Sequence, residues 1–247
     1  MRKDTQTKET YGLPADYEPN ETLETMDAVS GKDYWDANRT RQAFLYQYYV
    51  YVYAAELAEK RDIKTIMDVG CGPAPKLRLV HNKNPKAHII GVDQPSAIEY
   101  CQSTYNYGTW VVDDFENPKE DMDLPKADLI ISSDVIEHLM NPDKLLDYAR
   151  LKLADDGVIL FSTPDRARMT HEDQKTPDNP HHIREWTYRE LEDYFVSRGF
   201  EVVEHFHQWP LRLVPSKALV RKIISKIFKG EPRKWKYNQV IVVRPKT

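Results

Sequence analysis

The most informative stretch of this chain reads Thr65-Ile66-Met67-Asp68-Val69-Gly70-Cys71-Gly72-Pro73-Ala74. A short apolar run, typical of a buried strand, leads directly into a turn with two closely spaced glycines. Glycine lacks a Cβ and adopts positive φ at little cost, so this turn lets the backbone come close to a ligand. Turns of this kind lie at the carboxyl ends of parallel strands in open α/β sheets, where nucleotides bind.

Further strand-like runs alternate with helix-like segments along the chain. This alternation indicates right-handed βαβ units, in which helices cover both faces of a parallel sheet. The sequence therefore predicts a Rossmann-like, doubly wound α/β fold. The expected helices cover residues 34–61, with Asp36 or Asn38 as the N-cap, 141–154 and 187–198. The expected strands cover residues 65–69, 88–92, 110–112, 129–132, 158–162, 200–206 and 239–243.

The composition is that of an ordinary globular protein. The 247 residues are 40% hydrophobic and 30% charged, which excludes collagen-like, low-complexity and wholly disordered chains. No run approaches the ~18 apolar residues of a membrane span, and the first residues lack the apolar core of a secretory signal. Two cysteines, Cys71 and Cys101, fit a reducing compartment. We therefore expect a cytoplasmic protein with an N-terminal arm or lid over residues 1–32 and a single domain over residues 33–247.

Positive charge is concentrated near the C-terminus. Residues 212–247 contain eleven Lys and Arg but a single acid, Glu231, although the whole chain has a net charge of −4. The apolar spacing within an insertion at about 210–236 is that of an amphipathic helix with a basic face. We expect residues 212–236 to contact an anionic membrane surface or phosphate, with nucleic acid a less favoured partner. The alternative is a packing helix whose basic face is merely solvated.

An acid stands at the end of each of the first three expected strands. Asp68 lies inside the glycine turn, where it can bind an ammonium group or orient the loop. Asp93 ends the second strand and is positioned to accept hydrogen bonds from both ribose hydroxyls. Asp114 follows the third strand, where it can accept from an adenine amino group. These positions fit a nucleoside that lies across the carboxyl ends of a parallel sheet.

The combination resembles the class I S-adenosylmethionine-dependent methyltransferases over residues 65–198, and more loosely to residue 243. The resemblance implies seven strands, the last of them antiparallel, and S-adenosyl-L-methionine as the methyl donor. Ala74 departs from this pattern, because a third glycine is common there. A nicotinamide dehydrogenase is the competing interpretation, but Asp68 would repel a diphosphate and suits a sulfonium methionine. The donor site implied by the resemblance comprises Asp68, Gly70, Cys71, Gly72, Asp93, Gln94, Asp114, Phe115 and Ser133.

A second group of polar residues follows the fourth expected strand. If the chain turns helical there, Asp134, Glu137 and His138 stand at positions i, i+3 and i+4 on one face. His182 comes later, after the fifth strand and a long loop. Carboxylates and imidazoles can bind a divalent metal such as Mg, Mn or Zn, which would activate a substrate hydroxyl. Without a metal, His138 or His182 could act as a general base.

The motif Asp134-Val135-Ile136-Glu137-His138, followed by His182-x-x-Glu185-Trp186-Thr187, is similar to metal-dependent O-methyltransferases. These include small-RNA 2′-O-methyltransferases and ubiquinone-pathway O-methyltransferases. The resemblance implies Asp134, Glu137, His138 and His182 as metal ligands, with Glu137, His138 and His182 in catalysis. Asp134 has a shorter reach than the Glu of the RNA enzymes. The alternative is an acid-rich turn that only lines the donor pocket.

The acceptor is the least determined part of the prediction. Ser162-Thr163-Pro164-Asp165-Arg166 also looks like methyltransferases encoded with bacterial surface-polysaccharide enzymes, which suggests a sugar or another small hydroxyl compound. RNA is the rival acceptor, and a non-catalytic, methyltransferase-like binding protein is the remaining alternative. We expect the acceptor to bind under a lid formed by the N-terminal arm, the long aromatic helix and the loop at 164–180.

Overall fold

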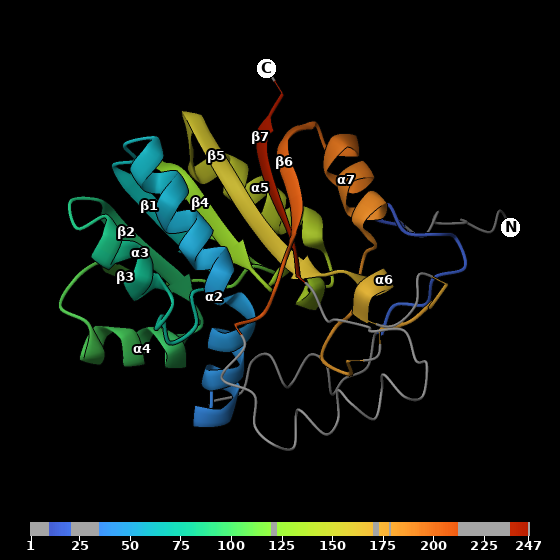
Figure 1. Cartoon of the computed structure of the whole chain (residues 1–247), viewed down its shortest axis with the longest axis horizontal. Coiled ribbons are helices and arrows are strands. Elements are labelled where there is room, and N and C mark those ends of the chain that lie inside the picture. Colours follow the sequence, from blue (N-terminus) through green and yellow to red (C-terminus); the bar gives the residue numbers. More distant parts are fainter. Residues whose placement is uncertain are drawn as a thin grey trace, which may run out of the picture.

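The computed structural model describes residues 10–20, 35–119, 123–169, 173–177, 179–211 and 238–246. Its centre is a seven-stranded sheet with the order β3-β2-β1-β4-β5-β7-β6 (Figure 1). Strands β1 to β5 run parallel, and β7 runs antiparallel to both β5 and β6. The predicted Rossmann-like fold with one antiparallel strand is confirmed. The strands are β1 (Thr65–Val69), β2 (His88–Asp93), β3 (Thr109–Val112), β4 (Ala127–Ser133), β5 (Leu153–Pro164), β6 (Phe200–Gln208) and β7 (Asn238–Pro245).

Helices cover both faces of this sheet. One face packs against α2, α3 and α4 in a core that includes Val50, Leu77 and Ile98. The other face packs against α5, α7 and residues of the N-terminal arm in a second core. Within the described residues, the α-helices are α2 (Ala37–Lys60), α3 (Leu77–Lys83), α4 (Pro95–Thr104), α5 (Pro142–Lys152), α6 (Arg166–Met169) and α7 (Tyr188–Ser197), and η1 (Ile136–His138) is a short 3₁₀ helix.

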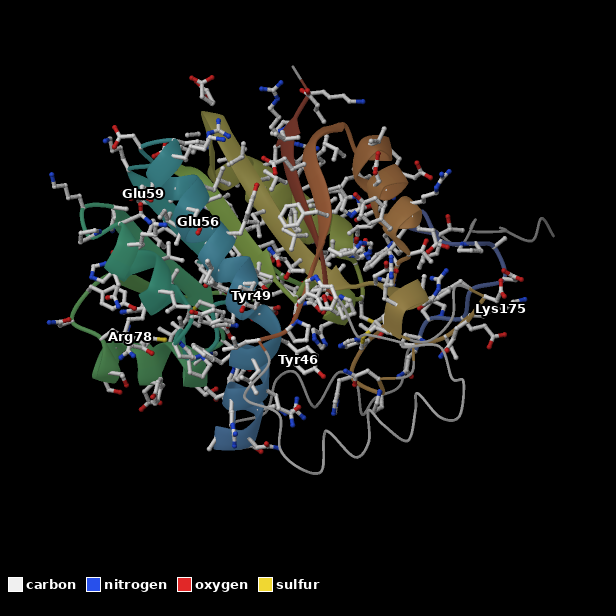
Figure 2. All side chains as sticks on the ribbon, in the orientation of Figure 1. Tyr46, Tyr49, Glu56, Glu59, Arg78 and Lys175 are labelled. Atoms are coloured by element: carbon white, nitrogen blue, oxygen red, sulfur yellow. The ribbon has the colours of Figure 1, made fainter. Side chains whose placement is uncertain are left out.

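The long helix α2 begins at Ala37, three residues after the predicted start, and the structure selects the first of its two predicted N-caps. The side chain of Asp36 accepts a hydrogen bond from the backbone N–H of Arg39 at 2.6 Å, so Asp36 is its N-cap. The tyrosines of α2 divide between two environments. Tyr51 is fully buried, whereas Tyr46 and Tyr49 lie on the exposed side of the helix (Figure 2).

The boundary between α5 and β5 was predicted wrongly. The helix ends at Lys152, and Leu153 already pairs with Ala127 of β4. The residues between Leu153 and Val158 are Ala154, Asp155, Asp156 and Gly157, so their sequence carries no strand signal. The register of pairing with β4 shifts between Ala127 and Leu129, and the extra residues of β5 before Val158 are accommodated at this irregularity.

The strand order reverses direction at β1, which lies between β2 and β4. The connections that follow β1 and β4 therefore leave the sheet in opposite directions, and open α/β sheets bind their ligands at the carboxyl ends of the strands at such a point. The glycine turn and η1 both lie at this edge. The fold thus brings together the two motifs that the sequence singled out.

Candidate functional site

The glycine turn after β1 is held tightly between its neighbours. Gly70 has a φ of +85° and Gly72 a φ of +57°, in the left-handed region that favours glycine. The backbone N–H groups of Gly70 and Cys71 donate to the carbonyl oxygen of Val92 at 2.8 and 3.2 Å. A Cβ on Gly70 would lie 2.3 Å from Cγ2 of Val135, which stands just before η1. The turn and the segment that follows β4 are therefore in direct contact.

Asp93 ties the end of β2 to the glycine turn. One carboxylate oxygen accepts from the backbone N–H of Gly72 at 2.8 Å, and the other accepts from that of Gln94 at 2.7 Å. Burial raises the pKa of this carboxyl, while these hydrogen bonds oppose the shift. A carboxylate has about four acceptor positions, so Asp93 retains acceptor capacity for the predicted ribose contacts.

Asp68 is fully buried behind the turn. The hydroxyl of Tyr51 donates to its carboxylate, with oxygen–oxygen distances of 2.9 and 3.1 Å. Burial raises the pKa of Asp68 to about 7, although the charge of the buried Lys76 opposes the shift. Sequence analysis missed Lys76 and the α2 residues Gln47 and Tyr51. The available signals were the tyrosine-rich helix and a lysine two residues beyond Ala74.

The remaining residues of the predicted donor site have mixed surroundings. Asp114 is exposed at the end of β3, where it accepts from the backbone N–H of Glu116 at 2.9 Å. Phe115 is partly buried against the core. The hydroxyl of Ser133 lies 2.7 Å from that of Ser162 inside the sheet. Cys71 is fully buried. The roles predicted for these residues toward the donor stay predictions.

Asp134 does not share a helical face with Glu137 and His138, so that expectation was wrong. Its φ of +54° places it in the left-handed region, and the helix that follows is the three-residue η1. This conformation turns its carboxylate toward other elements. Three groups donate to that carboxylate: the amides of Gln47 at 2.8 Å and Asn238 at 2.7 Å, and the hydroxyl of Ser162 at 3.1 Å.

Glu137, His138 and His182 form an acid–histidine cluster at the carboxyl edge of β4. One ligand atom from each lies within 4.8 Å of the others, and Asp134 is outside this set. The Glu137 carboxylate accepts from the hydroxyl of Thr163 at 3.0 Å. Its other oxygen, Oε1, is buried and has no hydrogen-bond partner among the described residues. Burial raises the pKa of Glu137 well above its ordinary value, and Asp134 adds to the shift.

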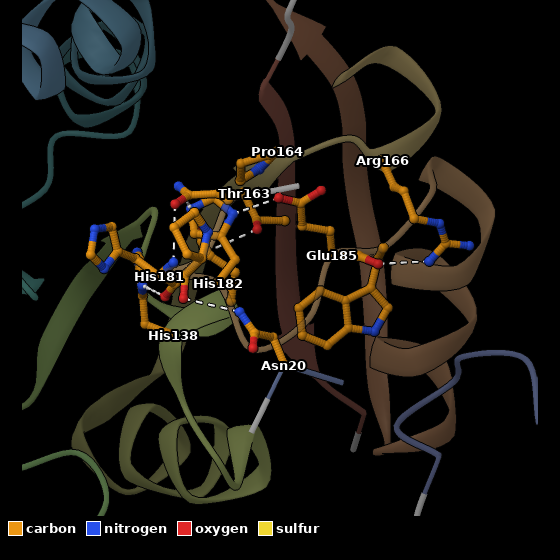
Figure 3. A network of polar contacts seen from close by, with 12 residues as sticks. Asn20, His138, Thr163, Pro164, Arg166, His181, His182 and Glu185 are labelled. Carbon is orange, nitrogen blue, oxygen red and sulfur yellow. Dashed lines mark hydrogen bonds and ion pairs between the residues drawn. The ribbon is translucent and has the colours of Figure 1, made fainter. Parts of the chain in front are cut away.

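A single side-chain hydrogen bond defines the tautomer of His138 (Figure 3). Nδ1 lies 2.7 Å from the carbonyl oxygen of His181, which can only accept, so Nδ1 carries the proton. Nε2 is then the basic nitrogen, and within the described ranges it has no hydrogen-bond partner. Burial lowers the pKa of His138 to about 3, with His182 contributing to the shift. The ring is therefore neutral near pH 7.

His182 is more constrained than His138. Its Nδ1 lies 2.6 Å from Oε1 of Glu185, and its Nε2 lies 2.8 Å from the side-chain amide of Asn179. The His182 ring meets the His138 ring edge-on, with centroids 4.9 Å apart. Sequence analysis did not assign roles to Asn179, Glu185 or Thr163, although Glu185 belongs to the quoted motif.

The segments predicted to form a lid meet beside this cluster. In the described part of the N-terminal arm, the N–H of Glu18 donates to the carbonyl of Lys175 at 2.6 Å, and that of Asn20 donates to the carbonyl of Ile183 at 2.8 Å. From α2, the guanidinium of Arg39 lies 3.3 Å from Nε2 of His181. The domain boundary at residue 32 and the lid function stay predictions. The basic insertion lies outside the described residues from 212 onward.

Comparison with known proteins gives the family. Residues 40–205 match a family model described as a methyltransferase domain. A Mycolicibacterium smegmatis protein named as a probable S-adenosylmethionine-dependent methyltransferase is 28% identical over 181 residues, or 72% of this chain and 63% of that protein. This chain therefore spans less than two thirds of the length of that relative.

Two solved structures share the fold. The methyltransferase of a complex with the Haloferax volcanii Trm112 methyltransferase activator has a TM-score of 0.64 at 15% identity, covering 88% of this chain and 99% of that one. The plantazolicin methyltransferase BpumL, in complex with a pentazolic desmethylPZN analog and SAH, has a TM-score of 0.58 at 14% identity, covering 90% and 98%. With the family match and the glycine turn in place, the chain belongs to the class I S-adenosylmethionine-dependent methyltransferases.

Proposed function

We propose that this chain transfers the methyl group of S-adenosyl-L-methionine to a hydroxyl oxygen of a small acceptor, such as a sugar or related metabolite. The observation that carries the proposal is the contact between the glycine turn and Val135, which lies between Asp134 and the acid–histidine cluster. A donor bound over Gly70 would have its methyl group beside groups that can deprotonate or orient a hydroxyl.

The donor would be held by the carboxylates at the ends of β1 and β2. Asp68 would face its ammonium group, and Asp93 would accept from its ribose. Transfer would be a direct displacement at the methyl carbon, in which the sulfonium leaves as a neutral thioether. Most of the rate enhancement would come from alignment of acceptor and donor at the carboxyl ends of β1 and β4.

A divalent metal fits the acid–histidine cluster. Oε1 of Glu137 and Nε2 of His138 have no hydrogen-bond partner among the described residues, and each offers a lone pair. His182 would complete the set if the Asn179 amide released its Nε2. When bound, the metal would lower the pKa of the acceptor hydroxyl. Asp134 is not part of this proposal, because its carboxylate already accepts three hydrogen bonds.

His138 by itself suits metal ligation better than general-base catalysis. A general base is most effective when its pKa lies near the working pH, and the pKa of His138 is about 3. Such a histidine stays unprotonated and suits ligation. We therefore expect chelation with EDTA to abolish turnover and Mg, Mn or Zn to restore it. Full turnover in chelator would contradict the metal and leave His138 as a weak base.

The donor site is tested by calorimetric titration with S-adenosylhomocysteine (SAH), the thioether that remains after methyl transfer, and with NAD. We expect SAH to bind and NAD not to bind. Asp93→Ala should weaken SAH binding by about 1–3 kcal/mol, partly because the Gly72 N–H loses its acceptor. Asp128→Ala is the matched control, since Asp128 accepts from the N–H groups of Lys64 and Thr65 at the opposite edge of the sheet. Unchanged SAH affinity in Asp93→Ala would contradict the assignment.

The acceptor is tested with radiolabelled methyl donor and fractionated cell extract. We expect label in a small-molecule hydroxyl fraction, and His138→Asn should reduce it by about 100-fold or more with little change in SAH affinity. His88→Asn, on the β2 strand, is the control. Label in RNA would contradict the small acceptor. SAH binding without label in any fraction would contradict catalysis.

A further inference from the structure

Lys76 is a buried cation that none of the roles above uses. It is the N-cap residue of α3, directly after the glycine turn, and only 3% of its surface is exposed. Its charge lowers the pKa values of both Asp68 and Asp93. Burial lowers the pKa of Lys76 itself, and the charges of Asp68, Asp134 and Asp93 oppose that shift. Lys76 therefore lies among the carboxyl groups of the proposed donor site.

The ammonium of Lys76 is incompletely hydrogen-bonded. Nζ donates to Oε1 of Gln47, and it lies 5.0 Å from the centroid of the Tyr51 ring. Within the described residues, Gln47 is its one hydrogen-bond acceptor, and no carboxylate oxygen lies within 4.0 Å. An ammonium has three N–H donors, so two remain for a ligand. The Gln47 amide in turn donates to Asp134 at 2.8 Å, which fixes Gln47 beside Nζ.

The methyl donor carries the group that this ammonium would recognise. Its methionine part has an ammonium group and a carboxylate, and this carboxylate would enter a site that already holds the carboxyl groups of Asp68, Asp93 and Asp134 near Lys76. Like charges at short range repel strongly inside a protein, so the donor carboxylate needs a cation. We propose that Lys76 binds the α-carboxylate of the methyl donor while Asp68 binds its ammonium. This inference rests on the proposed donor site.

A second role for Lys76 makes the opposite prediction. If Lys76 only neutralised Asp68 in the protein without bound donor, its ammonium would compete with the donor ammonium for Asp68. Removing it would then strengthen binding of every ligand that carries that ammonium, with or without a carboxylate. The two roles are therefore separated by a pair of ligands that differ only in the carboxylate.

The experiment titrates wild type and Lys76→Met with SAH and with its decarboxylated analogue, which keeps the ammonium. We expect Lys76→Met to weaken SAH binding by about 10- to 100-fold, as for loss of a hydrogen bond to a charged group. The affinity for the decarboxylated analogue should stay the same. Lys76→Arg should keep most of the SAH affinity, because the charge remains. Lys152→Met, which removes a buried lysine at the end of α5, is the matched control.

Each outcome has a distinct meaning. Equal weakening for both ligands, or a gain for both, would overturn the role of Lys76 while leaving the donor site intact. Failure of wild type to bind SAH would instead overturn the proposed function. Thermal unfolding of each variant shows whether it folds. If Lys76→Met does not fold, Lys76→Gln takes its place, and equal affinity of that variant and wild type for SAH would refute the proposal.

Discussion

At the scale of single residues, Gly70 is constrained by its backbone and by its surroundings. Its φ of +85° disfavours any residue with a Cβ, and that Cβ would lie 2.3 Å from Val135. Gly199 has a similar φ of +78°, but a Cβ there would meet only Arg150 at 4.0 Å. We expect Gly199→Ala to lower the free energy of unfolding by about 1 kcal/mol through strain alone.

Gly70→Ala should lower the free energy of unfolding by about 1–3 kcal/mol more than Gly199→Ala does, because overpacking against Val135 adds to the backbone strain. It should also weaken SAH binding, which Gly199→Ala should leave unchanged. Urea denaturation of both variants measures the first difference, and calorimetry measures the second. Equal losses of stability would show that Val135 moves aside freely and that the close contact has no energetic consequence.

Asp68 makes folding stability depend on pH. Its pKa is about 7 in the folded protein and about 3.9 in the unfolded chain, so between these values the folded state binds the extra proton. The stabilisation from this group is complete below about pH 4 and is lost as the pH rises to about 7, at up to about 1.4 kcal/mol per pH unit. The groups that face it are Tyr51, Lys76 and Asp93.

The check is the free energy of unfolding of wild type and Asp68→Asn at several values between pH 4 and pH 8. Asn cannot titrate, so the slope attributed to Asp68 should be missing in the variant. Parallel pH profiles for the two proteins would show that the buried carboxyl keeps an ordinary pKa.

At the scale of elements, α7 depends on an N-terminal capping box that also holds a buried ion pair. The side chains of Thr187 and Glu190 cap the helix reciprocally, and Glu190 lies 2.6 Å from Nη2 of the buried Arg166. Thr187→Ala should lower the free energy of unfolding by about 1 kcal/mol, the usual value for an N-cap. Glu190→Ala should cost about 3 kcal/mol or more, because it also takes a counter-charge from Arg166.

Chemical denaturation of the two variants, together with Glu190→Gln, tests this ranking. Gln keeps an acceptor at the same position but no charge, so its loss should lie between the other two. A smaller loss for Glu190→Ala than for Thr187→Ala would mean that the ion pair contributes nothing.

The elements also show which parts of the structure the local sequence pattern predicts and which it does not. The glycine turn, the N-cap of α2 and the strand positions follow from local sequence, because each depends on residues within a few positions. The segment after β4 does not, because Asp134 adopts positive φ to reach Gln47 and Asn238, which are remote in sequence. A helical face drawn from spacing alone therefore misplaced Asp134 while keeping Glu137 and His138 together.

At the scale of the whole molecule, residues 10–20 are integrated into the core. Tyr17 is 6% exposed, and its hydroxyl accepts from the backbone N–H of Glu185 at 2.9 Å. Tyr17→Phe should lower the free energy of unfolding by about 1–3 kcal/mol, since it leaves that buried N–H without its acceptor. Tyr17→Ala should cost about 3–5 kcal/mol, because a cavity is added.

Denaturation of both variants measures these losses, and turnover provides a second readout. Glu185 contacts His182, so Tyr17→Phe should also reduce turnover while SAH affinity stays unchanged. Wild-type stability in Tyr17→Ala would show that the arm is dispensable for the fold.

The sequence by itself determined the fold class, the glycine turn, the acids that end the first two strands and the close spacing of Glu137 and His138. These features depend on alternating strand and helix patterns, on backbone freedom at glycine and on short spacings. Only the tertiary structure decided which side chains surround Asp68, because Tyr51, Lys76 and Asp93 come from three different elements: α2, the N-cap of α3 and the end of β2. It also decided that the Asp134 carboxylate accepts hydrogen bonds from Gln47, Ser162 and Asn238, and that Tyr17 supports Glu185 from 168 positions away in the chain. Such contacts depend on how packed elements meet in space, and no local pattern encodes them.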